Sequence, residues 1–142
     1  MRKTYETPRY DVDIPSGDVG YVTMPFPASA MIKKLVVVQT AGSDVAFSVE
    51  VFNSSEVLPA SESVSASLSA AEEALHRVMD KLEAAAGEAI EVYNPNGYCY
   101  RNMSPDSSPS NNVREIYLRI TPVSAGNTTF SIVIGGEPAT AN

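Results

Sequence analysis

Residues 113–134 read Val-Arg-Glu-Ile-Tyr-Leu-Arg-Ile-Thr, then Pro-Val-Ser-Ala-Gly-Asn, then Thr-Thr-Phe-Ser-Ile-Val-Ile. Apolar residues take every second position in both arms: Ile116, Leu118, Ile120, Phe130, Ile132 and Ile134. A period of two is typical of strands with one buried face. The six residues between the arms include Pro, Ser, Gly and Asn, which favour turns. This stretch therefore predicts a β-hairpin with one apolar side.

Upstream segments repeat the alternation. Strands are predicted at residues 10–14, 19–24, 31–40, 45–51, 89–93 and 98–101. Turn-forming residues separate them at 15–18, 41–44 and 94–97, and we expect residues 41–44 to close a second hairpin. The centre of the strand at 31–40 is aliphatic on both faces. We therefore expect an opposite sheet to cover one face and a helix or a neighbouring molecule to cover the other.

A single amphipathic helix is predicted at residues 69–86. Ser69 and Glu72 form a capping-box pattern at its start, and Gly87 has the place of a residue that ends a helix. An apolar stripe at helical spacing is expected to pack on a sheet: Ala71, Leu75, Val78, Met79, Leu82, Ala85 and Ala86. Glu73 and Arg77 are expected to pair on the opposite face.

The pattern as a whole favours an all-β fold. About eight short strands with one inserted helix exclude alternating βαβ units. We expect an antiparallel β-sandwich, jelly-roll-like, over residues 10–134 with the helix inserted at 69–86. Residues 1–9 are expected to form an extended arm that either frays or reaches a neighbouring subunit, and residues 135–142 a tail without periodicity. Residues 53–67 and 102–112 are expected to be loops, the second a possible contact loop.

Composition narrows the function classes. The 142 residues carry 17 acidic and 10 basic side chains, a formal charge of −7. An acidic surface repels phosphate backbones and anionic lipids, so neither a nucleic acid nor a membrane is an expected partner. Arg2 and Lys3 precede a polar run, so we expect no export signal and a protein that is made and kept in a reducing cytoplasm or released from one by lysis. The single cysteine, Cys99, allows no internal disulfide and is interpreted as structural.

No catalytic or metal-binding motif stands out. His76 lies one helical turn from Glu72 and Asp80, an arrangement that is more often a solvated surface than a metal or acid–base site. Asp11 and Asp13 lack the companion loop of a calcium site and are expected to face solvent. We therefore predict no catalytic residue, no cofactor and no metal site, and an enzyme is the least favoured class.

Tyrosines are the candidate partner contacts. Tyr93, Tyr98 and Tyr100 surround the predicted 94–97 turn, where they could stack on a sugar or a protein, although cross-strand packing is the simpler interpretation. Tyr5 and Tyr10 could contact a neighbour from the N-terminal arm.

The segment from Arg114-Glu-Ile-Tyr-Leu-Arg-Ile-Thr-Pro122 to Gly126-Asn-Thr-Thr-Phe-Ser-Ile-Val-Ile-Gly-Gly-Glu137 resembles the C-terminal hairpin of small β-sandwich virion proteins of tailed bacteriophages, of the capsid decoration (cement) type. The resemblance covers about the last 25 residues, and no family functional residue can be transferred. It implies a non-enzymatic protein on the outside of the head, commonly trimeric, which bridges neighbouring major capsid proteins. The alternative is a receptor- or carbohydrate-binding module of a tail fibre or tailspike that uses Tyr93, Tyr98 and Tyr100.

Overall fold

The computed structural model describes residues 4–59, 68–105, 113–123 and 126–139. These residues form nine strands: β1 (Tyr5–Glu6), β2 (Tyr10–Ile14), β3 (Gly20–Pro25), β4 (Ser29–Ala41), β5 (Ala46–Phe52), β6 (Leu82–Ala84), β7 (Ile90–Arg101), β8 (Glu115–Val123) and β9 (Thr128–Pro138). A 3-10 turn, η1 (Ser55–Val57), and one short helix, α1 (Ala70–Leu75), lie between β5 and β6.

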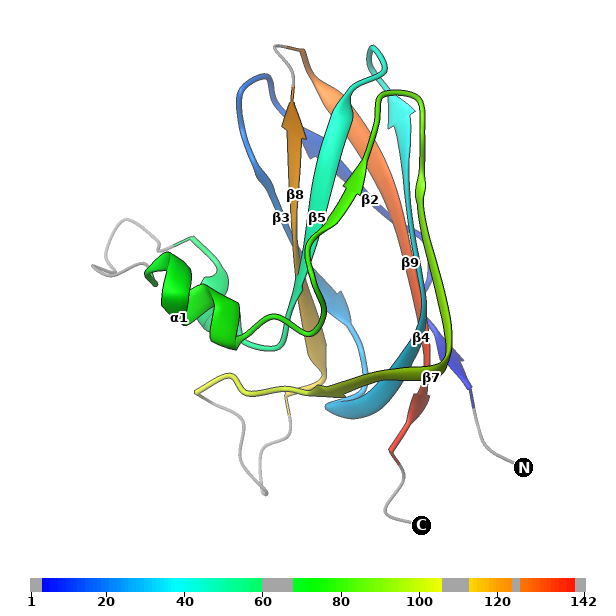
Figure 1. Cartoon of the computed structure of the whole chain (residues 1–142), viewed down its shortest axis with the longest axis vertical. Coiled ribbons are helices and arrows are strands. Elements are labelled where there is room, and N and C mark those ends of the chain that lie inside the picture. The colour runs from blue at the N-terminus through cyan, green and yellow to red at the C-terminus, as the bar shows by residue number, and fades with distance from the viewer. Residues whose placement is uncertain (1–3, 60–67, 106–112, 124–125, 140–142) are drawn as a thin grey trace.

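The strands form two antiparallel sheets that pack face to face (Figure 1). In the five-stranded sheet β1 and β2 both pair with β9, which is followed by β4 and β7; the four-stranded sheet has the order β3–β8–β5–β6. The pairs β2/β9, β3/β8, β4/β7 and β5/β6 are nested along the chain, like a long antiparallel ribbon that has been rolled up. This order is the jelly-roll arrangement, so the predicted all-β, jelly-roll-like sandwich is confirmed.

The core lies between the sheets. Inward residues from both layers are almost fully buried, among them Val22, Met24, Leu35, Val37, Val49, Ile116, Leu118, Phe130 and Ile132. Phe47 and Phe130 meet across the two layers with their ring centroids 4.7 Å apart. Each such side chain contributes on the order of 2 kcal/mol through burial, so the alternation seen in the sequence is what holds the layers together.

Two predicted hairpins are wrong. The arms at β8 and β9 do not pair with each other: β8 pairs with β3 and β5, whereas β9 pairs with β1, β2 and β4. The connection from β4 to β5 likewise crosses from one sheet to the other. Alternation fixes which face of a strand is buried, but both faces of a sandwich interior are apolar. The pattern therefore cannot distinguish a hairpin from a crossing between layers.

The predicted helix at 69–86 is also wrong in its extent. Helix α1 covers six residues, and the segment that follows returns to the four-stranded sheet, where Leu82 pairs with Val49 and Ala84 with Phe47. Met79 and Ala84 do enter the core, but Met79 from a bend and Ala84 from strand β6. Gly87 adopts a φ of 84° in the turn before β7 rather than ending a helix. The apolar residues of this segment fit the period of a helix as well as that of a strand, and pairing with the edge of β5 makes residues 82–84 a strand.

Residues 94–97 do not reverse the chain. Tyr93 pairs with Lys34 and Tyr98 with Ile32, so these four residues form a bulge opposite Lys33 within the single strand β7. Gly97 adopts a φ of 78° there, and a Cβ at this position would lie 2.9 Å from the Met31 Cβ. The turn-forming residues thus supply a bulge, which needs the same backbone freedom as a turn.

The residues near both chain ends belong to the five-stranded sheet. Strand β9 continues to Pro138, and Tyr5 and Glu6 pair with Gly136 and Gly135. The prediction that residues 135–142 form a tail beyond the sandwich is therefore wrong for residues 135–138, because paired glycines carry no hydrophobic period. Residues 1–3 and 140–142 of the predicted arm and tail, and much of the predicted loops (60–67 and 106–112), lie outside the described residues.

No helix among the described residues is long and apolar enough to cross a membrane.

Candidate interaction surfaces

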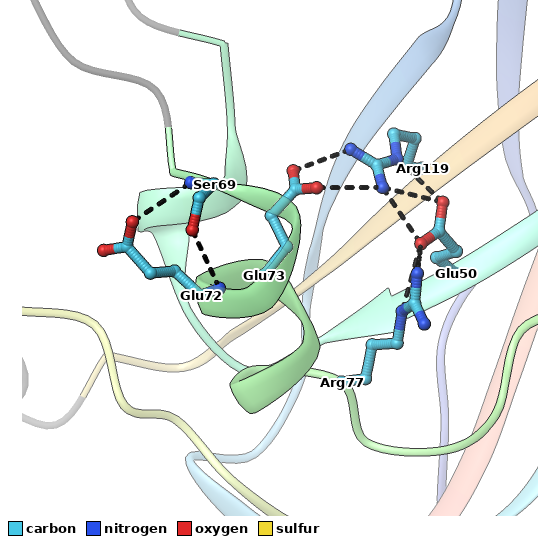
Figure 2. Close-up of polar contacts among 6 residues, drawn as sticks. All are labelled: Glu50, Ser69, Glu72, Glu73, Arg77 and Arg119. Carbon is cyan, nitrogen blue, oxygen red and sulfur yellow. Dashed lines mark hydrogen bonds and ion pairs between the residues drawn. The ribbon is translucent and has the colours of Figure 1, made fainter.

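The outer face of the four-stranded sheet is covered by the β5–β6 connection. Figure 2 shows a group of four charged side chains at this contact: Glu50, Arg77, Arg119 and Glu73. Glu50 accepts hydrogen bonds from Arg119 Nε (2.8 Å) and Arg77 Nη2 (2.6 Å), and Arg119 Nη1 also donates to Glu73 (2.8 Å). The Arg119 guanidinium lies 5.3 Å from the centroid of the Phe52 ring. This charged group fastens α1 to β5 and β8.

Glu50 is the centre of that group. Its side chain is nearly buried, and burial alone raises the pKa of a carboxyl. The hydrogen bonds from Arg119 and then Arg77 outweigh this effect, so the pKa of Glu50 lies below its ordinary value. The hydrogen bond to Glu50 in turn raises the pKa of Arg119 despite desolvation. Glu50 and Arg119 are therefore both ionised in the neutral range, and the charged group acts as a structural clamp.

Helix α1 is oriented opposite to the sequence expectation. The predicted capping box is present: the Ser69 hydroxyl accepts from Glu72 N, and the Glu72 carboxylate accepts from Ser69 N. However, Glu73 points at the sheet and pairs with Arg119 rather than with Arg77, while Leu75 is 81% exposed. None of the six residues of α1 is buried. Charge pairing, not an apolar stripe, sets which side of the helix faces the sheet.

A second apolar cluster and a polar network complete this covering. Phe52, Val57 and Tyr117 are buried together on the outer side of the four-stranded sheet. The Tyr117 hydroxyl contacts Ser104 Oγ (3.0 Å) and accepts from Asn102 Nδ2 (3.2 Å). The four-stranded sheet therefore has little of its outer face left for another molecule.

The outer face of the five-stranded sheet, by contrast, carries apolar side chains that are partly exposed. Val36 of β4 is in register with Val133 of β9, and both alternate with residues buried in the core. Val38 is 37% exposed and Tyr93 is 64% exposed. We call this surface, made by Val36, Val38, Val133 and Tyr93, the open face. In Figure 1 neither α1 nor a strand of the other sheet lies over this face. It is the strongest candidate interaction surface in the described part of the chain.

Charged pairs border the open face. Lys33 pairs with Glu137 and Lys34 with Glu6, each at 3.1 Å, near the end of the sheet where the chain begins and ends. On the β2 side, Ser131 and Thr129 donate hydroxyl hydrogen bonds to Asp11 and Asp13. The hydrogen bond from Ser131, followed by that from Arg9, lowers the pKa of Asp11. Asp11 and Asp13 thus face outward as predicted.

The five tyrosines predicted as partner contacts do not come together. Tyr93 lies on the open face, and Tyr10, 42% exposed, sits on the edge strand β2 with its side chain toward the sandwich interior. Tyr5 packs edge-to-face on Phe26 at 5.8 Å, and Tyr98 packs partly against the core. Tyr100 is 1% exposed and donates to the Glu115 carbonyl oxygen, so in the folded chain it is not available to a partner. The 94–97 bulge separates Tyr93 from Tyr98 across the two faces of the sheet.

The remaining candidates for chemistry are dispersed. The His76 ring contacts Asn53 Oδ1 at 3.1 Å and lies 4.0 Å from Glu56. Cys99 is exposed on β7. Among the described residues, no group of three or more His, Cys, Asp or Glu side chains could hold a metal ion. An open pocket of about 660 Å³ between Tyr5, Phe26 and Arg114 has, among its lining residues, a single charged side chain.

Sequence reasoning missed the open face as a site, although its signal was present. The strand at 31–40 was recognised as aliphatic on both faces, and a helix was one of the two expected covers. The helix instead lies over the other sheet (Figure 1). What the sequence could not give is that Val133 and Tyr93 join Val36 and Val38, because those neighbours come from strands about 100 and 60 residues away along the chain.

No protein-family model matches the chain, and no curated protein matches it at a significant level.

Proposed function

We propose that this protein is a non-enzymatic structural protein of a tailed-bacteriophage particle, bound to the outside of the head, where it bridges neighbouring major capsid proteins and stabilises the shell. The observation that carries the proposal is the resemblance of residues 114–137 to phage virion proteins of the decoration type, a resemblance of sequence, since the two arms lie in different sheets of this chain rather than in one hairpin. These residues supply β8 and β9, interior strands of the two sheets. The resemblance therefore concerns the centre of the fold rather than a peripheral segment.

The open face supports a role based on surface contact. Decoration acts by adding buried area across the joints between shell subunits, which requires an exposed, firmly supported surface and not a cleft. Valines on paired strands of a jelly roll meet that requirement because the sheet fixes their spacing. As a homo-oligomer, a trimer by the same resemblance, the protein would gain strong attachment from several weak contacts through effective concentration.

The carbohydrate-binding alternative has less support. Jelly rolls occur both in viral capsid proteins and in lectins, so the fold alone favours neither function. The alternative depended on a stacking platform of Tyr93, Tyr98 and Tyr100. With Tyr100 buried and Tyr98 turned toward the core, Tyr93 is the single exposed ring of the three. Stacking on a sugar by one ring is not enough to favour that function.

Quantitative mass spectrometry of purified particles tests the proposal. Particles of the phage that encodes the chain should contain it at several hundred copies, and purified chain should sediment with expanded heads that lack it. Detection at a few copies per particle would place it in the tail, and its absence from purified particles would refute the proposal.

A further inference from the structure

The two outer faces of the sandwich differ in how far the described residues cover them. On the four-stranded sheet, the β5–β6 connection buries Glu50, Phe52 and Tyr117 to 4% exposure or less. On the five-stranded sheet, Val36, Val38, Val133 and Tyr93 have no such cover among the described residues. Val36 and Val133 are half-buried side by side on two paired strands, and Val38 beside them is exposed. Aliphatic surface of this kind costs solubility, and it marks contact sites when it is rimmed by polar groups. The β5–β6 connection, which contains α1, thus covers the four-stranded sheet and not the open face (Figure 1).

The charges around the open face indicate what could cover it. Five carboxylates and four cations lie on this side of the sheet or at its margin: Glu6, Asp11, Asp13, Glu91 and Glu137 against Arg9, Lys33, Lys34 and Arg101. Arg9, Lys33 and Lys34 are already paired, with Asp11, Glu137 and Glu6 respectively, whereas Arg101 lies beside Ser29 at the end of β4 away from the valine centre. Among the described residues this leaves Asp13 and Glu91 without a cationic partner, on opposite edges of the valine centre.

This distribution argues against a second copy as the occupant. Two open faces placed together would bring ten carboxylates into one contact with eight cations, six of which already have partners, while the two Arg101 side chains lie beside Ser29, away from the valine centre. Like charges at a desolvated margin are unfavourable by several kcal/mol. A surface with an aliphatic centre and lysine or arginine at its edges would instead pair with Asp13 and Glu91.

Tyr93 gives the same indication. Its ring is 64% exposed beside Lys34 on the neighbouring strand, whose ammonium is occupied by Glu6. An exposed tyrosine face attracts a cation within about 6 Å, and tyrosine paired with arginine is common where contacts contribute most to binding.

From these observations we infer that the open face docks onto a protein surface that presents aliphatic side chains flanked by lysine or arginine. This inference rests on the proposed function, in which that surface belongs to the outside of the expanded head.

Co-sedimentation with expanded heads that lack the chain, prepared from the phage that encodes it, tests the inference. Val38→Glu and Tyr93→Ala should each weaken binding about tenfold or more. Glu91→Lys should weaken binding at low ionic strength and much less at 0.5 M NaCl, because a contact at the rim is screened. Leu75→Glu is the matched control, since it places the same charge at an exposed aliphatic residue on the far side and should bind like wild type. Thermal melts of all four variants should match wild type.

The outcomes separate the inference from the function. If wild-type protein does not bind heads at all, both are overturned. If wild type and the open-face variants bind equally, the proposed function stands and the assignment of the open face is wrong. Analytical ultracentrifugation adds a third test: self-association that Val38→Glu abolishes would show that a second copy covers the open face, and would overturn the inference.

Discussion

For Glu50 the sequence predicts the direction of the side chain correctly but not its burial. Alternation along 45–51 predicts that it faces outward from the sheet, and it does. Its burial could not be predicted, because the groups that cover and neutralise it, Arg77 and Arg119, are 27 and 69 residues away. A buried carboxylate depends on such partners, since the cost of removing its charge from water is several kcal/mol without them.

Glu50→Gln should destabilise the protein by about 2 kcal/mol at pH 7, because it leaves two arginines facing each other beside a neutral amide. The folded-state pKa of Glu50 lies below its ordinary value of 4.5. Its contribution is therefore complete above pH 4.5 and is lost as the pH falls through the folded-state value. Urea unfolding at several pH values should show that wild type loses stability in acid more steeply than Glu50→Gln. Some acid dependence should remain in the variant, because the pKa of Asp11 is also lowered. Parallel curves would contradict this account.

At the scale of elements, the sequence predicted strands well and connections poorly. Strand positions follow from alternation, which is local. Which strand pairs with which depends on layers that meet only in the folded chain, so alternation predicts hairpins at two places where the chain crosses between sheets. The same limit explains the predicted helix. Leu82 fits the helical stripe, but residues 82–84 pair with the edge of β5, whose backbone groups a longer helix would have left without these hydrogen bonds.

The crossing from β4 to β5 has a specific requirement at Gly42. Its φ is 92°, and a Cβ there would collide with the Asn127 carbonyl oxygen in the neighbouring crossing. Gly17 has a φ of 79° with nothing within 4 Å of such a Cβ, so it provides the matched control. Gly17→Ala should cost about 1 kcal/mol from backbone conformation alone. Gly42→Ala should cost at least about 1 kcal/mol more. Equal melting temperatures for the two variants would argue against the close approach of the two crossings.

Helix α1 gives a second test at this scale. Leu75 is 81% exposed, whereas Met79 lies in the core. Leu75→Ala should therefore change the free energy of unfolding by less than about 0.5 kcal/mol, and Met79→Ala should lower it by about 2 kcal/mol. A continuous helix at 69–86 with both residues on its packed side would give two large and similar losses, which chemical denaturation would reveal.

The whole molecule is a rolled ribbon whose two layers depend on each other. Each sheet alone would leave an apolar face in water, so the layers should form together. Ile132, at 0% exposure in the middle of β9, tests this dependence. Ile132→Asp buries a charge without a partner and should prevent stable folding. A cooperative melt near the wild-type temperature would mean that the Ile132 side chain does not lie between the layers.

The amount that the sequence predicts also depends on scale. The fold class followed from alternation and from the single helix, and it is confirmed. The candidate surface did not follow, because an exposed tyrosine and a buried one look alike in a sequence, and the four-residue bulge that separates Tyr93 from Tyr98 reads as a turn. A surface assembled from three strands becomes visible once their register is known.

The most direct test of the central claim is a cryo-electron microscopy reconstruction of expanded heads carrying this protein. Our account predicts a jelly roll on the outside of the shell with Val36, Val38, Val133 and Tyr93 toward the major capsid protein. Basic side chains of that protein should lie near Asp13 and Glu91. A reconstruction in which the open face points to solvent, or in which the protein is missing from the shell, would contradict it.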